Sequence, residues 1–88
     1  MSCSVRVASP LRSYTQGAAR VTSRGATVAA VLADLDRRYP GMRFRMIDEQ
    51  DRIRPHMRVF LGSSELRDVD ARLEPAATLH IVQALSGG

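Results

Sequence analysis

Gly87 and Gly88, the last two residues of the chain, are the residues whose type and position point most clearly to chemistry. Glycine lacks a Cβ atom, so its backbone can enter a channel that excludes other residues. The terminal carboxylate is a poor acyl electrophile, and it reacts only after activation, for instance as an acyl-adenylate that a partner enzyme makes from ATP. Sulfur transfer to the activated carbonyl gives a thiocarboxylate, whereas attack by an amine gives an isopeptide bond. The sequence therefore predicts a reactive tail, and an idle glycine terminus is the alternative.

The tail that carries these glycines is expected to be short and separate from the folded domain. We expect residues 1–84 to form one domain and residues 85–88 to form the tail. The tail spans about 13 Å when it is extended, which is enough to reach into a partner protein. Leu85 and Ser86 connect the domain to the two glycines, and we therefore expect them to contact that partner.

Other residue types that could carry chemistry occur in patterns that favour structural roles. His56 and His80 lie far apart in the sequence and have no neighbouring ligand set, so no metal site is expected. Asp48 and Glu49 resemble a pair of catalytic carboxylates, but their polar surroundings favour a solvated loop. Cys3 is the single cysteine, and we expect it to be an incidental thiol near a frayed terminus. A single unpaired cysteine is typical of a reducing cytoplasm, which is the expected location of the protein.

The composition indicates a small globular domain without a catalytic cleft of its own. The chain has 88 residues, of which 44% are hydrophobic and 25% are charged. A chain this short buries only about two-thirds of its unfolded surface. All 13 basic residues are arginine and the formal net charge is +4, but the arginines are spread along the chain, so a nucleic-acid partner is not expected. No apolar run approaches the roughly 20 residues that span a bilayer, so no membrane partner is expected.

The clearest periodic pattern predicts a helix that begins after Thr27. A hydroxyl at this position can accept a hydrogen bond from a free amide of the first turn. Apolar residues recur at helical spacing and form one stripe, consisting of Val28, Val31, Leu32, Leu35 and Tyr39. Asp34, Arg37 and Arg38 are expected on the opposite, solvated side. Pro40-Gly41 ends the helix.

Alternating apolar and polar residues predict strands at 4–8, 19–23, 54–61, 65–67 and 78–84. Residues 42–54 show no clear period and contain the polar loop. The first two strands are expected to form a hairpin, and the helix is expected to cross one face of a mixed sheet. The first and last strands could then pair in parallel at the sheet centre. This α+β order is the β-grasp plan, with four to five strands and one main helix.

A second candidate site lies on the strand that contains Phe60. Strand alternation places Phe60 and Arg58 on the face opposite to Val59 and Leu61, together with Val82 of the last strand. An apolar patch ringed by arginine is typical of a partner-binding surface. The alternative is that Phe60 packs under the loop formed by residues 42–54.

The order of these elements, together with several short motifs, resembles the MoaD/ThiS family of ubiquitin-like sulfur carriers over nearly the whole chain. The motifs are Pro10-Leu11-Arg12 with Tyr14-Thr15, Gly25-Ala26-Thr27-Val28, Leu32, Leu35, Tyr39-Pro40-Gly41, Arg54-Pro55-His56, Val59-Phe60-Leu61, Leu79-His80-Ile81 and Gly87-Gly88. The branch that includes the carrier for cysteine biosynthesis is the most similar. The family's Asp-Gly-Asp before the last strand is replaced here by Glu74-Pro75-Ala76-Ala77.

The resemblance implies a protein cosubstrate rather than an enzyme. An ATP-dependent adenylating enzyme would activate the Gly88 carboxylate, and the resulting thiocarboxylate would donate sulfur to a biosynthetic enzyme that makes cysteine, a cofactor or a natural product. The chain itself would bind no cofactor, because the partner enzyme uses the ATP. The alternatives are the small subunit of molybdopterin synthase, a ubiquitin-like protein modifier and an interaction module with an idle tail.

Overall fold

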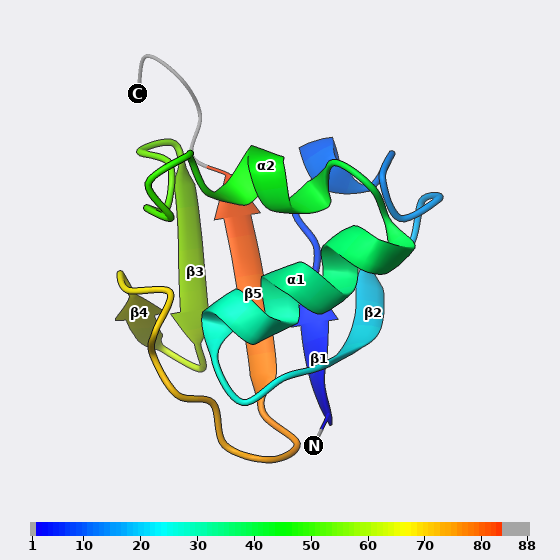
Figure 1. Ribbon diagram of the computed structural model, residues 1–88. Coiled ribbons are helices and arrows are strands. Elements are labelled where there is room, and N and C mark those ends of the chain that lie inside the picture. The colour runs from blue at the N-terminus through cyan, green and yellow to red at the C-terminus, as the bar shows by residue number, and fades with distance from the viewer. Residues whose placement is uncertain (1, 84–88) are drawn as a thin grey trace.

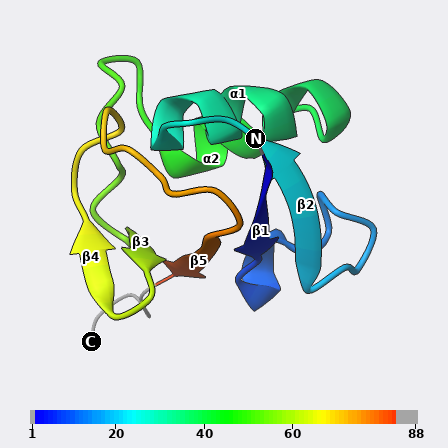
Figure 2. The same ribbon diagram turned by 90° about the horizontal axis from the view of Figure 1, so that it is seen from below.

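The fold is a five-stranded sheet that carries two helices on one of its faces (Figures 1 and 2). The computed structural model describes residues 2–83. Its elements are β1 (Ser2–Arg6), the 3-10 helix η1 (Ser9–Leu11), β2 (Arg20–Arg24), α1 (Val28–Arg38), α2 (Met42–Met46), β3 (Met57–Leu61), β4 (Ser64–Leu66) and β5 (Thr78–Gln83). The strand order is β2-β1-β5-β3-β4, in which β1 and β5 are parallel and the other neighbours are antiparallel. The predicted α+β β-grasp fold and its central parallel pair are therefore confirmed.

Helix α1 packs its apolar stripe against the sheet, as the periodicity predicts. The Thr27 hydroxyl accepts a hydrogen bond from the Ala30 amide at 3.2 Å, so the predicted helix start is confirmed. The buried core is formed by Val28, Val31, Leu32 and Leu35 of α1 with the inward side chains Val5, Val21, Met57, Val59, Leu79 and Ile81 of the strands. Helix α1 ends at Arg38, and Gly41 then leads the chain into α2 with a φ of 95°, which glycine adopts without the steric cost that a Cβ atom would bring. Both α-helices lie on the same face, and within residues 2–83 the other face, which we call the helix-free face, carries no α-helix (Figure 2).

The connection between β4 and β5 supports the first turn of α1. The Ala29 amide donates to the Val69 carbonyl at 2.8 Å, and the Val28 amide donates to the Ala71 carbonyl at 3.2 Å. These bonds satisfy amides that a helix start leaves without an intrahelical partner. Val69 and Leu73 are buried and fix this connection against the core. The chain therefore enters β5 at a defined position in the sheet centre.

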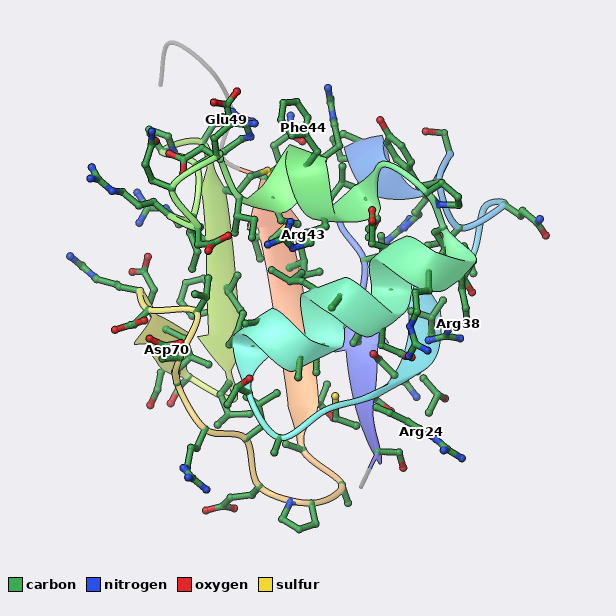
Figure 3. The ribbon with its side chains drawn as sticks, in the orientation of Figure 1. Arg24, Arg38, Arg43, Phe44, Glu49 and Asp70 are labelled. Atoms are coloured by element: carbon green, nitrogen blue, oxygen red, sulfur yellow. The ribbon has the colours of Figure 1, made fainter. Side chains whose placement is uncertain are left out.

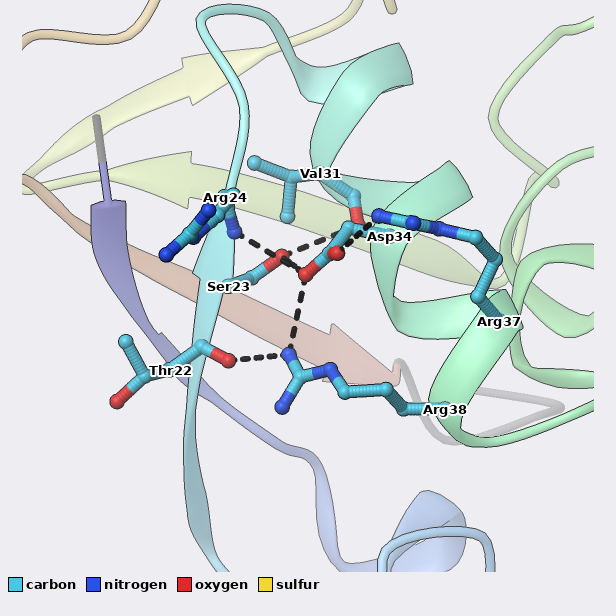
Figure 4. Close-up of polar contacts among 7 residues, drawn as sticks. All are labelled: Thr22, Ser23, Arg24, Val31, Asp34, Arg37 and Arg38. Atoms are coloured by element: carbon cyan, nitrogen blue, oxygen red, sulfur yellow. Dashed lines mark hydrogen bonds and ion pairs between the residues drawn. The ribbon is translucent and has the colours of Figure 1, made fainter.

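Asp34 is buried, so its predicted place on the solvated side of α1 is wrong. Arg38, next to it in space, lies at the edge of α1 that faces β2 (Figure 3). The Asp34 carboxylate accepts hydrogen bonds from the Ser23 hydroxyl at 2.9 Å and from the Arg24 amide at 3.1 Å (Figure 4). Arg37 and Arg38 form ion pairs with it from the solvent side. Helical periodicity alone does not show this because the deciding partners belong to the edge strand β2.

The contacts of Asp34 favour its charged form. The Arg24 amide is the main cause that holds the pKa of Asp34 below its ordinary value of 3.8, and the Ser23 hydroxyl, Arg38 and Arg37 add to this effect. Burial acts in the opposite direction, but it does not outweigh these partners. A carboxylate with a lowered pKa in the folded state stabilises the fold above its unfolded pKa.

Replacement of Asp34 by Asn should lower the free energy of unfolding by about 1.5–3 kcal/mol at neutral pH, because hydrogen bonds to a charged group are lost. The folded pKa is lowered, so the advantage of the wild type should be constant above the ordinary value of 3.8. It should shrink as the pH falls through the lower folded pKa. Urea titrations across this pH range measure the difference. Glu49→Gln, which removes an exposed carboxylate, is the control and should change little; a pH-independent difference for Asp34→Asn would contradict the prediction.

Cys3 lies inside β1 and is buried, so the prediction of a thiol near a frayed terminus is wrong. Cys3 shares the inward face of the strand with Val5, and it pairs with Ser23 of β2. Burial is the main cause that raises the pKa of the Cys3 thiol above its ordinary value of 9.0, and the nearby charge of Asp34 adds to it. Cys3 is therefore a protonated core residue, and its thiol takes no part in the chemistry expected of the tail.

Candidate functional site

The helix-free face of the sheet carries the residues that the sequence predicts for partner binding. Arg58 and Val82 are exposed, and Phe60 is half-buried. Arg58 lies opposite Val82 in the ladder between β3 and β5, and Phe60 lies opposite His80. The predicted strand alternation is confirmed, because Val59 is buried on the helix side. Phe60 therefore does not pack under residues 42–54, and the structure brings Phe60, Arg58 and Val82 together on one surface.

The tail itself lies outside the described residues. Leu85, Ser86, Gly87 and Gly88 follow β5, whose last residue is Gln83. Gln83 lies opposite Met57, the first residue of β3. The strand that leads into the tail is therefore the central strand of the sheet, held by β1 on one side and by β3 on the other. The predicted roles of the four residues and the predicted boundary at residue 84 stay predictions.

Phe44 is an exposed aromatic residue that the sequence analysis did not identify. It lies on α2, points away from α1 and is found at the end of the molecule where β5 ends (Figure 3). Its side chain is 61% exposed. The guanidinium of Arg54 stacks over the ring with its central carbon 4.6 Å from the centroid, and Arg54 Nε donates to the Phe44 carbonyl at 2.8 Å. An aromatic ring fixed by a cation is a surface feature that suits partner contact.

A signal for Phe44 is present in the sequence. Residues 42–54 have no long period, so they predict no element, whereas the structure forms the short helix α2. Met42 and Met46 are one turn apart and both are buried, which leaves Phe44 between them on the exposed side. Five residues are too few for the periodicity to distinguish a helix from a loop.

The charged groups near Phe60 form ordinary surface pairs. Arg58 contacts Glu65 at 3.1 Å, and Arg67 contacts the same carboxylate at 3.8 Å. Such exposed pairs contribute about 0–1 kcal/mol to stability. Their main effect is to hold Arg58 beside Phe60 on the sheet surface. The face thus presents an aromatic ring with positive charge at its margin.

Asp48 and Glu49 do not form a catalytic pair. The Asp48 carboxylate accepts hydrogen bonds from the amides of Gln50 at 2.9 Å and Arg52 at 3.0 Å, so it closes its own loop. The Arg52 amide is the main cause that lowers the pKa of Asp48 below 3.8. Glu49 is exposed and makes no hydrogen bond or ion pair with the rest of residues 2–83. The polar loop predicted here is confirmed.

Residues 2–83 contain neither a cluster of metal-binding side chains nor a helix that could span a membrane. His56 precedes β3, whereas His80 lies in the middle of β5 on the helix-free face, so the structure does not bring them into one cluster. Within residues 2–83, no three or more His, Cys, Asp or Glu side chains are placed to hold a metal ion. The helices in this part of the chain are too short or too polar to cross a membrane.

Three solved structures share this fold over nearly the whole chain. The chain is 27% identical to a chain of the Amycolatopsis orientalis BexX/CysO complex, with a TM-score of 0.91 over 98% of this chain and 99% of that chain. It is 22% identical to Mycobacterium tuberculosis CysO, with a TM-score of 0.89 over 94% and 99% of the two chains. It is 19% identical to SAMP1 from Haloferax volcanii, with a TM-score of 0.82 over the full length of both.

The chain is therefore similar to CysO and SAMP1 proteins and shares their MoaD/ThiS-like β-grasp fold. The chains that it resembles are small proteins of nearly the same length, since the matches cover 94–100% of this chain and 99–100% of those chains. One of the similar structures is a complex of CysO with BexX, so a protein of this fold binds a separate protein. No protein-family model and no curated protein sequence matches the chain.

Proposed function

We propose that this protein is a sulfur carrier whose reactive group is the Gly88 carboxylate. The observation that carries the proposal is the position of Gly87-Gly88 a few residues after β5, the central strand of a MoaD/ThiS-like domain. A central strand has neighbours on both sides and gives the tail a rigid base. The likeness to CysO proteins supports the same proposal. The protein would be consumed and regenerated as a cosubstrate, so it would not be an enzyme.

The proposed reaction has two steps, both performed by a partner enzyme that uses ATP. The Gly88 carboxylate first attacks the α-phosphate of ATP, which forms an acyl-adenylate and releases pyrophosphate. A sulfide then attacks the acyl carbon, the bond between that carbon and the AMP oxygen breaks, and AMP leaves. The product is a thiocarboxylate, which a biosynthetic enzyme can accept as a sulfur source for cysteine, a cofactor or a natural product. Cofactor binding by the chain itself is not part of the proposal.

In this reaction the residues of the chain would bind the partner enzyme and would allow the tail to enter the channel of that enzyme. Gly87 would allow the partner's channel to close around a backbone without a side chain. Leu85 and Ser86 would lead the tail into that channel. Phe60, Arg58 and Val82 would dock on the partner, because they form the apolar and positively charged surface on the helix-free face. Phe44 and Arg54 lie at the end of the molecule where β5 ends, and they would contact the same partner.

The test is the intact mass of the protein purified from its native host. The expected mass corresponds to replacement of one carboxylate oxygen by sulfur, and treatment with an alkylating reagent should modify the C-terminal residue. Peptides in which Gly88 is joined to a lysine of another protein would favour the modifier alternative instead. A stable complex with a large catalytic subunit would favour the molybdopterin synthase alternative. If Gly88 carries neither a thiocarboxylate nor a bond to a lysine in host cells that need sulfur, the proposal is contradicted.

Replacement of Phe60 by Asp should weaken binding of the adenylating enzyme by tenfold or more and should cost little stability. The side chain is half-buried on the helix-free face, so its loss removes partner contact rather than core packing. Binding is measured by calorimetric titration and stability by urea denaturation. Ser63→Asp adds the same charge in the turn after β3 and should bind normally. A large loss of stability in Phe60→Asp would show that Phe60 belongs to the core.

A further inference from the structure

The helix-free face carries two arginines and a histidine in one row across β2, β1 and β5. In the strand register, Arg20 of β2 lies directly opposite Arg6 of β1, and Arg6 lies opposite His80 of β5. Arg6 and Arg20 are exposed, and the ion pairs formed among residues 2–83 involve neither of them. Like charges directly opposite each other on one face of an antiparallel pair destabilise the sheet. Residues 2–83 therefore hold two positive charges side by side without an ion pair that compensates either of them.

Among residues 2–83, no acidic residue occupies an outward position of β1, β2 or β5. The outward positions of β1, β2 and β5 are taken by serine, threonine, arginine, histidine and valine. Among the described strand residues of this face, the one carboxylate is that of Glu65 on β4, at the opposite edge of the sheet, and Arg58 and Arg67 already pair with it. The charges of Arg6 and Arg20 consequently remain available to a negatively charged partner.

Arg12 adds a third cation, which the fold holds in place. Its Nε donates to the carbonyl of Val7 at 3.1 Å, and the residue is half-buried. No carboxylate of residues 2–83 pairs with its guanidinium. The remaining donors of a guanidinium fixed in this way can bind a carboxylate with little loss of conformational entropy.

Arg6 and Arg12 border a groove that also has apolar walls. Arg6, Arg12 and His80 line it together with Pro10 and Val82, between the end of β1 with η1 and the last half of β5. The groove shares Val82 with the surface formed by Phe60, Arg58 and Val82, which we call the Phe60 surface. The groove and the Phe60 surface are therefore continuous. The groove follows β5 toward Gln83, so a segment bound in the groove would lie beside the end of the strand that leads into the tail.

We propose that this groove binds an acidic segment of a partner protein, in which carboxylates flank an apolar side chain. The carboxylates would bind Arg12 and Arg6, and the apolar side chain would contact Pro10 and Val82. The groove and its charge are independent of the proposed function. The identification of the partner as the adenylating enzyme, however, rests on the proposed function. A nucleic acid fits less well, because the cations converge on one short groove instead of following a phosphate backbone. The partner would remove the repulsion between Arg6 and Arg20 that the free protein retains.

The first test measures the repulsion in the free protein. Arg20→Thr should raise the melting temperature by about 2–5 °C at low salt, because it removes a like-charge cross-strand pair. Arg24→Thr is the matched control, since Arg24 lies on the same strand and face but opposite Ser2. The difference between the two variants should largely disappear at about 1 M salt, where the screening length falls to about 3 Å. Equal melting temperatures for the two variants at low salt would overturn the proposal.

The second test measures binding without any partner enzyme or tail chemistry. A synthetic peptide with the sequence Glu-Glu-Leu-Glu-Glu is titrated into the full-length, nitrogen-15-labelled protein. The amide signals of Val7, Ala8 and residues 80–83 should shift, and Arg12→Gln should weaken binding about tenfold, the equivalent of one charge-assisted hydrogen bond. Arg72→Gln removes the same charge outside the groove and should bind normally.

The outcomes of this titration separate the proposal from its competitors. Shifts confined to other surfaces, absence of shifts at millimolar peptide, or equal binding by Arg12→Gln would overturn the proposal. Tighter binding of an oligothymidylate than of the peptide at the same residues would also overturn it, in favour of a nucleic acid. Because neither ATP nor Gly88 takes part, failure here leaves the sulfur-carrier proposal standing. Conversely, an unmodified Gly88 in the native host leaves the groove proposal standing.

Discussion

Deletion of Gly88 should abolish thiocarboxylate formation while the domain stays folded. In the proposed function the reacting carboxylate belongs to Gly88, and its removal would leave the chain end one residue short of the position at which the partner would activate it. One residue of extended chain corresponds to about 3.3–3.6 Å, more than an enzyme can tolerate between reacting atoms. The protein, ATP, the cognate adenylating enzyme and sulfide are incubated together, and pyrophosphate release and intact mass are measured. The expected result is complete loss of both signals.

Two control measurements accompany this deletion: the melting temperature of the truncated protein and its binding to the adenylating enzyme. The described core comprises residues between Cys3 and Ile81, so the truncated protein should keep the wild-type melting temperature. It should also keep binding the adenylating enzyme through the Phe60 surface, with a modest loss from the missing tail contact. Thiolation of the truncated protein at the wild-type rate would show that the C-terminal carboxylate is not the reacting group.

Replacement of Leu35 by Ala should lower the free energy of unfolding by about 2–5 kcal/mol. Leu35 is fully buried in the core between α1 and the sheet, so truncation removes apolar burial and leaves a cavity. For a domain of this size, each kcal/mol corresponds to about 4–8 °C in melting temperature. Urea denaturation and a thermal scan measure the change.

Leu66→Ala provides a matched comparison for Leu35→Ala, because it makes the same chemical change at a half-buried position on the edge strand β4. Its cost should be clearly smaller, since less area returns to water and a void at the edge can fill with solvent. Equal losses at the two positions would contradict the assignment of Leu35 to the centre of the core. The two losses also provide a scale for Phe60→Asp, which should lower the free energy of unfolding only slightly.

The fold places its core and its proposed partner-binding surfaces on opposite faces of one sheet. The helix side holds the core, together with the buried cluster of Asp34, Ser23 and the Arg24 amide. The helix-free side holds Phe60, Val82 and the basic groove, which contribute little to packing. Changes on the second face should therefore alter partner binding with small effects on folding.

Several features of this protein could be predicted from the sequence because they depend on local patterns. The apolar stripe from Val28 to Leu35 requires a helix of 3.6-residue period with one buried face. The alternation around Val59 and Ile81 fixes which side of β3 and β5 faces the core, and it correctly placed Phe60 and Val82 outside. The reactive role of Gly87 and Gly88 was also inferred from the sequence, and it stays a prediction because both residues lie outside the described part of the chain.

Other features were decided only by the tertiary structure, because they depend on residues distant in the sequence. The burial of Asp34 follows from β2, which supplies a hydroxyl and an amide that compensate a charge otherwise too costly to bury. The opposition of Arg6 and Arg20 follows from the register of β1 with β2, and the position of Arg12 beside them follows from η1 and the Val7 carbonyl. Strand periodicity determines which face a side chain occupies, but only the pairing register determines which charge lies next to it.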